Sequence, residues 1–342
     1  MSRLVAAIRR RTALALLPLS VIPFVAVAPT VVRSHERFER AHQSGPLPAP
    51  VVALSAAETA RFAPLPARPG TVPVLVWHGI DDARDGYSTS RRAFARQLAL
   101  LKRLGYTAIS TRQWADFRAG KSTNLPAKPI LLTFDDGRLD SYRGADRVLE
   151  RDGMRAAIFV ITGDIDRRSP FYLTWSELHR MADSGRWDVE PHAHDGHTEI
   201  TVAPDGRQAG FYAARRYTRS AGRESMAGWE ARVSTDLFTL RDRFAAQGFV
   251  SHAFAVPFND YGQRDAADPE IPRLLSGLLT RQFGSFFVQA DDNDPTFTVP
   301  GSGVAQRYEL RTGTTLDQLY GWLRKHSVPA PAARHHHPTT KG

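Results

Sequence analysis

Short apolar runs alternate with amphipathic helical patterns between Pro73 and His326. The apolar runs predict strands at 74–77, 107–109, 129–132, 156–161, 187–190 and 252–256, with further strands near Phe283 and Phe297. Periods of about 3.6 residues predict helices at 91–104, near Trp114, and at 142–151, 175–184, 228–247 and 315–325. Two runs at 200–203 and 208–212 flank Pro204-Asp205-Gly206-Arg207 and predict a hairpin. Repeated strand-helix alternation over roughly 250 residues favours an α/β barrel over an open sheet.

The amino-terminal segment predicts export across a membrane. Arg3, Arg9, Arg10 and Arg11 precede an uncharged stretch from Thr12 to Val32, which at about 1.5 Å per residue is long enough to cross a hydrocarbon core of about 30 Å. The basic flank places the amino terminus in the cytoplasm and the rest of the chain outside. A cleaved signal peptide is the alternative to an uncleaved anchor, because 26–28 form a small-x-small site, but Pro29 disfavours cleavage there. The anchor is the favoured reading of residues 1–32.

Proline-rich segments bound the predicted catalytic domain. Residues 33–72 carry six prolines from Pro46 onwards and predict a semi-extended linker, residues 73–326 form the domain, and residues 327–342 form a Pro/His-rich disordered tail. The chain has no cysteine, which excludes disulfides and thiolate metal sites. Its formal net charge of +10 favours contact with anionic envelope surfaces. No interleaved aromatic and basic pattern supports nucleic-acid binding.

Two adjacent carboxylates stand where a predicted strand ends. Asp135 and Asp136 follow the apolar run 129–132 and precede Gly137. Asp is depleted in strands and like charges repel, so the pair suits chemistry better than structure. One Asp can bind a metal while its neighbour stays ionised as a base.

A histidine cluster follows the predicted strand that starts at Trp187. His192, His194 and His197 lie within six residues. Either His192 with His197, five apart, or His194 with His197, three apart, can supply two imidazoles. Neutral imidazoles suit zinc, cobalt or nickel, and one carboxylate completes a triad of ligands with open positions.

These motifs resemble those of the polysaccharide deacetylases with the NodB homology fold, carbohydrate esterase family 4. The run 133–137 (TFDDG) is similar to the first motif of that family. The run 192–197 is similar to the second motif, in the five-apart form of the poly-β-1,6-N-acetylglucosamine deacetylases, and 254–258 (FAVPF) is similar to the third. The resemblance covers most of residues 73–326 and implies a distorted (β/α) barrel.

The resemblance also implies a role for each matching residue. Asp136, His192 and His197 would hold a divalent metal, zinc first, with cobalt or nickel as alternatives, and Asp135 would act as the general base. The backbone N–H of Phe258 would stabilise the oxyanion. His194 would orient a ligand without binding the metal. Substrate contacts are expected from Pro257, Phe258 and Tyr261.

The chain departs from the family pattern at two points. Ala255 stands where most members carry an arginine that orients the catalytic Asp. The family's late Leu-x-His motif, whose His is the general acid, has no match, since Leu178-His179 lies too early and His326 follows a helix. The proton donor is therefore unassigned by the sequence.

The resulting prediction is an extracytoplasmic, metal-dependent hydrolase of N-acetyl groups. The expected partner is an N-acetylglucosamine polysaccharide, with poly-β-1,6-N-acetylglucosamine first and peptidoglycan second, and the membrane is reached through residues 1–32. The alternatives are an O-acetyl esterase on polysaccharide and a non-catalytic sugar-binding barrel. The sequence does not determine the oligomeric state.

Overall fold

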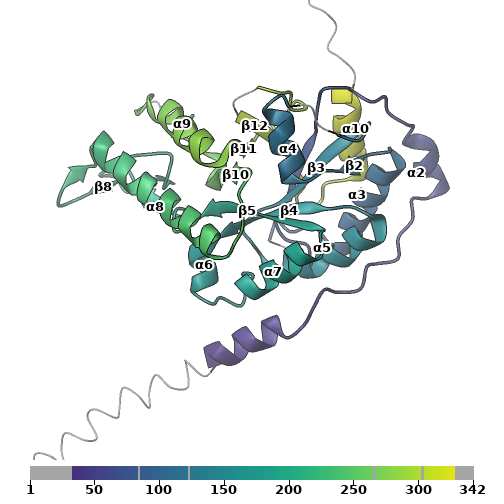
Figure 1. Cartoon of the computed structure of the whole chain (residues 1–342), viewed down its shortest axis with the longest axis horizontal. Coiled ribbons are helices and arrows are strands. Elements are labelled where there is room, and N and C mark those ends of the chain that lie inside the picture. Colours follow the sequence, from purple (N-terminus) through teal and green to yellow (C-terminus); the bar gives the residue numbers. More distant parts are fainter. Residues whose placement is uncertain (1–32, 84, 122–123, 265–266, 302–303, 328–342) are drawn as a thin grey trace, which may run out of the picture.

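Parallel strands form a nearly closed barrel with helices around it (Figure 1). The computed structural model describes residues 33–327 apart from 84, 122–123, 265–266 and 302–303. The barrel strands are β1 (Val74–Trp77), β2 (Thr107–Ala108), β3 (Pro129–Phe134), β4 (Ala156–Ile161), β5 (Trp187–Ala193), β10 (Phe254–Ala255), β11 (Phe286–Gln289) and β12 (Val304–Glu309). The helices are α2 (Ala56–Arg61), α3 (Arg91–Arg103), α4 (Thr111–Arg118), α5 (Leu139–Asp152), α6 (Thr162–Asp166), α7 (Trp175–Asp183), α8 (Met226–Ala246), α9 (Ile271–Phe283) and α10 (Leu316–Ser327).

The strand order is β10-β11-β12-β1-β3-β4-β5, with β2 pairing beside β3, and every barrel pair is parallel. The two ends of this order, β5 and β10, meet without a backbone ladder in the described part of the chain. Side chains bridge them instead. The Glu190 carboxylate accepts from the N–H groups of His252 and Ala253 at 2.8 and 3.1 Å, and His192 Nδ1 lies 2.7 Å from the Ala255 carbonyl. We call this junction the β5–β10 closure.

Alternate strand residues fill the inside of the barrel, as the two-residue period of a strand requires. Small and aromatic side chains pack there, and Trp114 and Phe117 of α4 join them from outside the strands. The other face of each strand packs under the helices in a larger cluster that includes Trp77, Phe94 and Phe134. The barrel is therefore a packed core, and a site can open only at its ends.

Local sequence signals set the helix boundaries. The side chains of Ser90, Ser110, Thr174 and Ser225 accept from the first-turn N–H groups of α3, α4, α7 and α8. Gly153 ends α5 in the left-handed conformation, which a residue without Cβ adopts readily. Between β5 and α8 the chain forms two small hairpins, β6 (Glu199–Thr201) with β7 (Gln208–Gly210) and β8 (Tyr217–Thr218) with β9 (Gly222–Arg223).

The predicted α/β barrel and the hairpin around 204–207 are confirmed. The strand predicted near Phe283 is present a few residues later, as β11, and the strand predicted near Phe297 is wrong. Phe283 ends helix α9, and Phe297 lies in a loop next to an isolated bridge at Thr298, so the last two strands lie at 286–289 and 304–309. Helix α9 is rich in apolar residues, whereas strand β12 carries the charged residues Arg307 and Glu309. Short apolar runs usually predict buried strands and charged residues argue against them, so the composition of these two elements misled the prediction.

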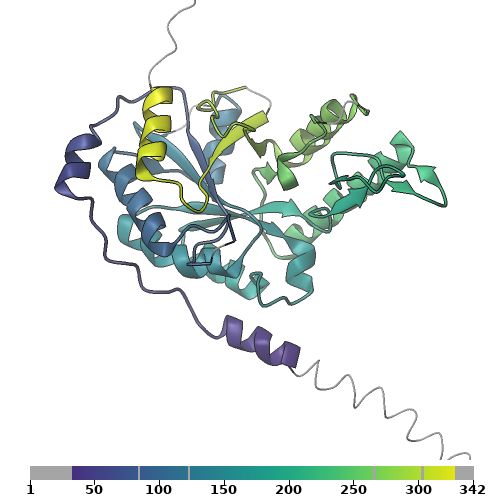
Figure 2. The same cartoon turned by 180° about the vertical axis from the view of Figure 1, so that it is seen from behind.

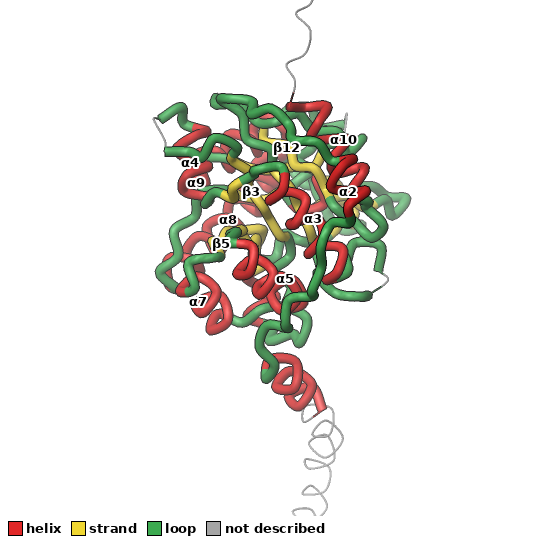
Figure 3. The backbone as a smooth tube through the Cα atoms, turned by 90° about the vertical axis from the view of Figure 1, so that its right-hand side faces the viewer, coloured by secondary structure: helices red, strands yellow, loops and turns green. Residues whose placement is uncertain are grey.

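Residues 43–72 run along the outer surface of the barrel in Figure 2, and the helix before them, residues 33–42, extends from its lower edge in Figures 2 and 3. The Leu47 N–H donates to the Arg143 carbonyl of α5 at 2.8 Å, and Arg68 Nη1 donates to the His326 carbonyl of α10 at 2.7 Å. Phe62 is fully buried in the outer core cluster. Part of the predicted linker 33–72 thus packs against the domain. The domain boundaries themselves stay a prediction.

No helix within the described ranges is both long and apolar enough to cross a bilayer. The predicted membrane segment, 12–32, and residues 328–342 of the predicted tail lie outside the described residues.

Candidate active site

A pocket of about 470 Å³ opens where the carboxyl ends of the barrel strands meet. Because the strands are parallel, the residues that follow β1, β3, β5, β10, β11 and β12 converge at this one end. They bring His78, Asp135, Asp136, His192, His197, Phe258, Gln289 and Glu309 into the same lining. The motifs at 133–137 and 192–197, far apart in the sequence, therefore belong to one site.

Asp136, His192 and His197 form a group with the character of a metal site. One ligand atom from each lies within 4.8 Å of the others. Asp136 Oδ1 is 3.6 Å from His192 Nε2 and 3.4 Å from His197 Nε2. Ligand atoms about 2 Å from a tetrahedral ion lie about 3.3 Å apart, so the three residues fit one shared cation. The other imidazole pair left open by the sequence, His194 with His197, is not the one that the structure brings to Asp136.

The ring of His192 is held in the orientation that a ligand needs. Its Nδ1 lies 2.7 Å from the Ala255 carbonyl, to which an Nδ1–H donates. In the neutral ring with its proton on Nδ1, Nε2 is the atom available to a cation, and it faces Asp136. A backbone carbonyl on the far ring nitrogen is a common way to fix the tautomer of a metal-bound histidine. Ala255, where the sequence lacks an arginine, thus contributes its carbonyl.

Burial and mutual charge set the protonation of the three ligands. Burial and the neighbouring His192 lower the pKa of His197 to about 4. Burial would lower the pKa of His192 as well, but the carboxylates of Asp136 and Asp135 raise it. Burial opposes ionisation of Asp136, and the surrounding imidazoles still hold its pKa well below the usual range. The cluster therefore combines an ionised carboxylate with His197, whose protonation burial disfavours, whereas a cation would compete with a proton at His192.

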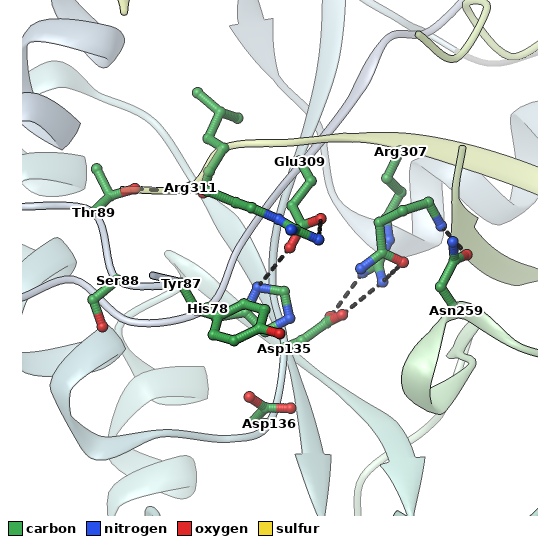
Figure 4. A network of polar contacts seen from close by, with 12 residues as sticks. His78, Tyr87, Ser88, Thr89, Asp135, Asp136, Asn259, Arg307, Glu309 and Arg311 are labelled. Carbon is green, nitrogen blue, oxygen red and sulfur yellow. Dashed lines mark hydrogen bonds and ion pairs between the residues drawn. The ribbon is translucent and has the colours of Figure 1, made fainter. Parts of the chain in front are cut away.

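Asp135 is paired with an arginine that the sequence analysis missed. Arg307 of β12 donates to both of its carboxylate oxygens, at 2.7 and 2.6 Å, and neither side chain reaches solvent (Figure 4). Burial alone would raise the pKa of Asp135, but the guanidinium of Arg307 holds it below its usual value. An arginine from a different strand therefore holds the Asp that precedes the candidate metal ligand Asp136, in place of the arginine that is absent at position 255.

His78 faces the same pocket directly after β1, and the sequence analysis did not single it out. Its Nδ1 lies 3.5 Å from Glu309 Oε1, and Glu309 is bonded in turn to Arg311 at 2.6 Å (Figure 4). An imidazole backed by a carboxylate is the arrangement expected of a proton donor. The two histidines weighed from the sequence lie elsewhere. His179 contacts Gln247, and His326 contacts Asp294, outside the pocket lining.

Three non-glycine residues of the pocket have left-handed backbone conformations. Asp136, Phe258 and Asn259 have φ values of 69°, 57° and 56°. Such conformations cost free energy for residues with a Cβ and concentrate at functional sites. Gly137, at φ 69°, follows Asp136, and a Cβ there would come within 3.0 Å of Val160. The turn that presents Asp136 is thus fixed by its packing against β4.

The loop between the two candidate histidine ligands is held by a carboxylate on α8. Asp236 accepts from the backbone N–H groups of His194 and Asp195 at 3.1 and 2.7 Å, and from the hydroxyl of Tyr212. The His194 ring lies away from the ligand cluster, with Nδ1 2.9 Å from Thr162 Oγ1. Among the described residues, the His194 side chain makes no hydrogen bond to the ring of His192 or His197. Its predicted role in orienting a ligand would therefore come from its backbone N–H, which Asp236 holds.

Two of the residues expected to contact substrate lie outside the pocket lining. Pro257 is buried, and the Tyr261 ring packs edge-on against Phe286 with 5.8 Å between centroids. Phe258 does line the pocket, with its ring 4.7 Å from that of His197. Of the three residues predicted to contact substrate, only Phe258 lines the pocket, and its contact with substrate stays a prediction.

Residues 122–232 match the family model described as polysaccharide deacetylase. This range holds both Asp residues and the histidine ligands of the candidate site. The chain carries a polysaccharide deacetylase domain.

Solved structures of similar fold support the assignment of the deacetylase domain. A de-N-acetylase from Aggregatibacter actinomycetemcomitans superposes with a TM-score of 0.62 at 21% identity, covering 74% of this chain and 99% of that one. IcaB from Ammonifex degensii superposes with a TM-score of 0.54 at 25% identity, covering 75% of this chain and 98% of that one. The expected NodB-type barrel is thereby confirmed, and the family and its neighbours indicate a deacetylase enzyme.

Curated relatives of the deacetylase domain include poly-β-1,6-N-acetyl-D-glucosamine N-deacetylases. The protein of Escherichia coli (strain K12) is 26% identical over 205 residues, which cover 54% of this chain and 30% of that protein. The protein of Staphylococcus aureus (strain MRSA252) is 24% identical over 150 residues, covering 39% and 51%. The chain therefore spans about half or less of these relatives.

Proposed function

We propose that the deacetylase domain is a metal-dependent hydrolase of N-acetyl groups on an extracytoplasmic N-acetylglucosamine polysaccharide. Poly-β-1,6-N-acetylglucosamine is the first choice of substrate, in line with the named relatives, and peptidoglycan the second. One observation carries the proposal: the ligand cluster of Asp136, His192 and His197 shares a pocket with the Arg307-held Asp135. Zinc is the proposed metal, with cobalt and nickel as alternatives for the same ligands.

A metal at Asp136, His192 and His197 supplies a Lewis acid for the acetyl carbonyl and lowers the pKa of a nearby water. Asp135, ionised and aimed by Arg307, accepts the proton of the attacking water. The backbone N–H of Phe258 donates to the developing oxyanion. His78 gives its proton to the sugar nitrogen as the carbon–nitrogen bond breaks, and the products are acetate and a free amine.

The proposed location is outside the cytoplasm, on a membrane reached through residues 1–32. The relatives named above carry names for activity on a polysaccharide. The net charge of +10 also favours an envelope rich in anionic lipid and polymer.

The alternative of a non-catalytic sugar-binding barrel loses its motivation. It rested on a missing arginine and a missing proton donor. Arg307, buried behind Asp135, would serve as the arginine, and His78, which lines the pocket, would serve as the proton donor. An O-acetyl esterase would use the same metal and base, and only the choice of acetylated substrate separates it from the proposed function.

The test measures acetate and free amine released by the purified full chain. The substrates are N-acetylated β-1,6-linked oligomers, peptidoglycan fragments and O-acetylated xylan, with and without a chelator, and with zinc, cobalt or nickel restored. We expect amine release from the first substrate that is lost on chelation and in Asp135→Asn, and kept in Asp205→Asn, which changes an exposed turn. Activity that survives chelation or Asp135→Asn refutes the mechanism, and acetate released only from xylan selects the esterase.

A further inference from the structure

Tyr87 is an exposed aromatic residue at the mouth of the pocket, apart from the candidate ligands and the proposed base. It lies in the loop between β1 and α3, and half of its surface is open to solvent. It lines the pocket together with His78 and Asp136 (Figure 4). A single exposed aromatic residue is common on a protein surface, but one that lines a pocket can offer its ring face to a ligand.

The position of Tyr87 is fixed before any ligand binds. Asp85 accepts from the backbone N–H groups of Tyr87 and Ser88 at 2.9 and 2.6 Å, and from the Ser88 hydroxyl at 2.7 Å. Arg138, which also lines the pocket, contacts the same carboxylate at 3.3 Å. Burial opposes ionisation of Asp85, but these hydrogen bonds lower its pKa to about 2, so the loop is held at all ordinary pH values.

Two neighbouring side chains also contact the ring of Tyr87 and hold it in place. The guanidinium of Arg311 lies 5.4 Å from the ring centroid of Tyr87, within the range of a cation–π contact. The ring of His78 lies 5.7 Å away and is tilted by 56°. Arg311 is bonded to Glu309, the carboxylate beside His78, so the aromatic ring and the imidazole share one support.

The chemistry of the reaction then decides what lies against Tyr87. When an N-acetyl group is hydrolysed, the bond that breaks joins the carbonyl carbon to the nitrogen on the sugar. That nitrogen takes the proton from His78, so the sugar ring that carries it must lie on the His78 side of the pocket. Tyr87 is the exposed aromatic on that side, whereas Phe258 packs against His197 on the ligand side.

We propose that Tyr87 is the stacking platform for the sugar ring that carries the reacting acetamido group. The C–H face of that ring rests on the phenol ring, and the acetyl group points past His78 toward Asp136 and His197. Tyr87 is thus a determinant of specificity for a pyranose substrate. This inference rests on the proposed function, because it takes the direction of proton transfer from it.

The test measures binding and turnover of a β-1,6-linked N-acetylglucosamine pentamer by the zinc-loaded full chain. Binding is measured by calorimetry in the Asp135→Asn background, which removes turnover. We expect Tyr87→Ala to raise the Kd about tenfold, while Tyr87→Phe and Tyr87→Trp stay within about twofold of the unaltered protein because they keep a ring face. Phe238→Ala removes an aromatic residue of similar exposure on α8 and should change nothing.

In the active protein, Tyr87→Ala should raise KM for the pentamer far more than it changes the release of acetate from ethyl acetate, which has no ring, and it should keep the zinc content. Unchanged pentamer binding in Tyr87→Ala overturns the inference, and so does a loss in Tyr87→Phe as large as in Tyr87→Ala. If the unaltered protein releases no acetate from any substrate, the proposed function fails instead, and that result is independent of the Tyr87 variants.

Discussion

Arg307 and Asp135 form a two-point ion pair, with bonds of 2.7 and 2.6 Å, inside the end of a closed barrel where neither side chain reaches solvent. Arg307 also lies over Phe159 and Phe287 of the barrel interior. Buried charges of this kind persist only when they are paired, because an unpaired charge carries its full desolvation cost. The base of the proposed reaction is therefore part of the barrel core.

Replacement of Arg307 should change both stability and the pH profile. Arg307→Ala leaves Asp135 buried without its partner, so we expect a loss of about 3–5 kcal/mol in the free energy of unfolding at neutral pH. The pKa of Asp135 is below its unfolded value because of Arg307, so the pair stabilises the fold above that unfolded value and the contribution is lost as pH falls through the lower folded pKa. Without the guanidinium this pKa rises, and the acid limb of kcat/KM should move to higher pH.

Arg307→Lys is the matched control for that prediction. It keeps the positive charge and loses the two-pronged geometry, so it should lose less stability and shift the acid limb less. Chemical denaturation and pH-rate profiles of both variants measure the two effects. An acid limb at the same pH in all three proteins contradicts the assigned pairing of base and arginine.

His78→Gln should slow the reaction according to the leaving group. Loss of a general acid costs about 10²–10⁴ in rate when the leaving group needs a proton. A sugar amine needs one and a nitrophenolate does not, so kcat on the N-acetylated oligomer should fall far more than on 4-nitrophenyl acetate. His179→Gln, outside the pocket, serves as the control. Equal losses on both substrates would show that His78 does not supply the proton.

Replacement of Asp136 and replacement of Asp135 should have different effects on zinc binding, although the two residues are neighbours. Asp136→Ala removes a ligand, so elemental analysis should find little metal and added zinc should not raise the melting temperature. Asp135→Asn keeps all three ligands and should bind zinc and be stabilised by it, by about 2.7 kcal/mol at a free concentration 100 times the Kd. If Asp135→Asn loses its zinc and Asp136→Ala keeps it, then Asp135 is the metal ligand and Asp136 is not.

Asp236→Asn should weaken metal binding without touching a ligand. The amide cannot accept from all the groups that Asp236 now holds, so at least one buried N–H of the 194–195 backbone loses its partner, at a cost of about 1–3 kcal/mol. Asp242→Asn on the exposed face of the same helix is the control. Calorimetric titration with zinc measures the difference, and equal affinities in the two variants would mean that the loop keeps its shape unaided.

Phe62→Ala tests whether residues before the barrel belong to the folded unit. Phe62 is fully buried, with its ring 5.1 Å from that of Tyr320 on α10. Its truncation should cost about 3–5 kcal/mol, the usual loss for a buried aromatic. Val51→Ala, at a residue of the same segment that is almost fully exposed, should cost almost nothing. Similar stabilities of the two variants would make 33–72 a spacer after all.

Residues that lie close together in the sequence could be predicted, and residues that meet through strand order could not. The Asp pair and the histidine cluster are short motifs at strand ends, and the alternation of elements indicated the barrel. Arg307 and Glu309 reach the site because β12 pairs with β1 and β11, an order that no local pattern reveals. Their strand was also missed, since charged residues inside a barrel argue against a strand until their partners are known.

His78 was missed for a related reason. A single histidine after an apolar strand carries no signal of its own, and its partner Glu309 lies more than two hundred residues later. The register that sets Val76 opposite Glu309 brings the two together. Tyr261 shows the opposite case, since its nearness in sequence to Phe258 suggested a place in the pocket, whereas its ring packs on Phe286 and is not among the lining residues.

The β5–β10 closure gives His192 two tasks at once. One ring nitrogen faces the ligand cluster. The other ring nitrogen bonds to the Ala255 carbonyl and so links strand β5 to strand β10. An exchange of this histidine for another ligand type, as in an attempt to change metal preference, would also remove one of the bonds between β5 and β10 and leave, within the described ranges, only the two that Glu190 accepts. Substitutions meant to change the metal preference are therefore better placed at Asp136 and His197, for which the described residues show no bond in the β5–β10 closure.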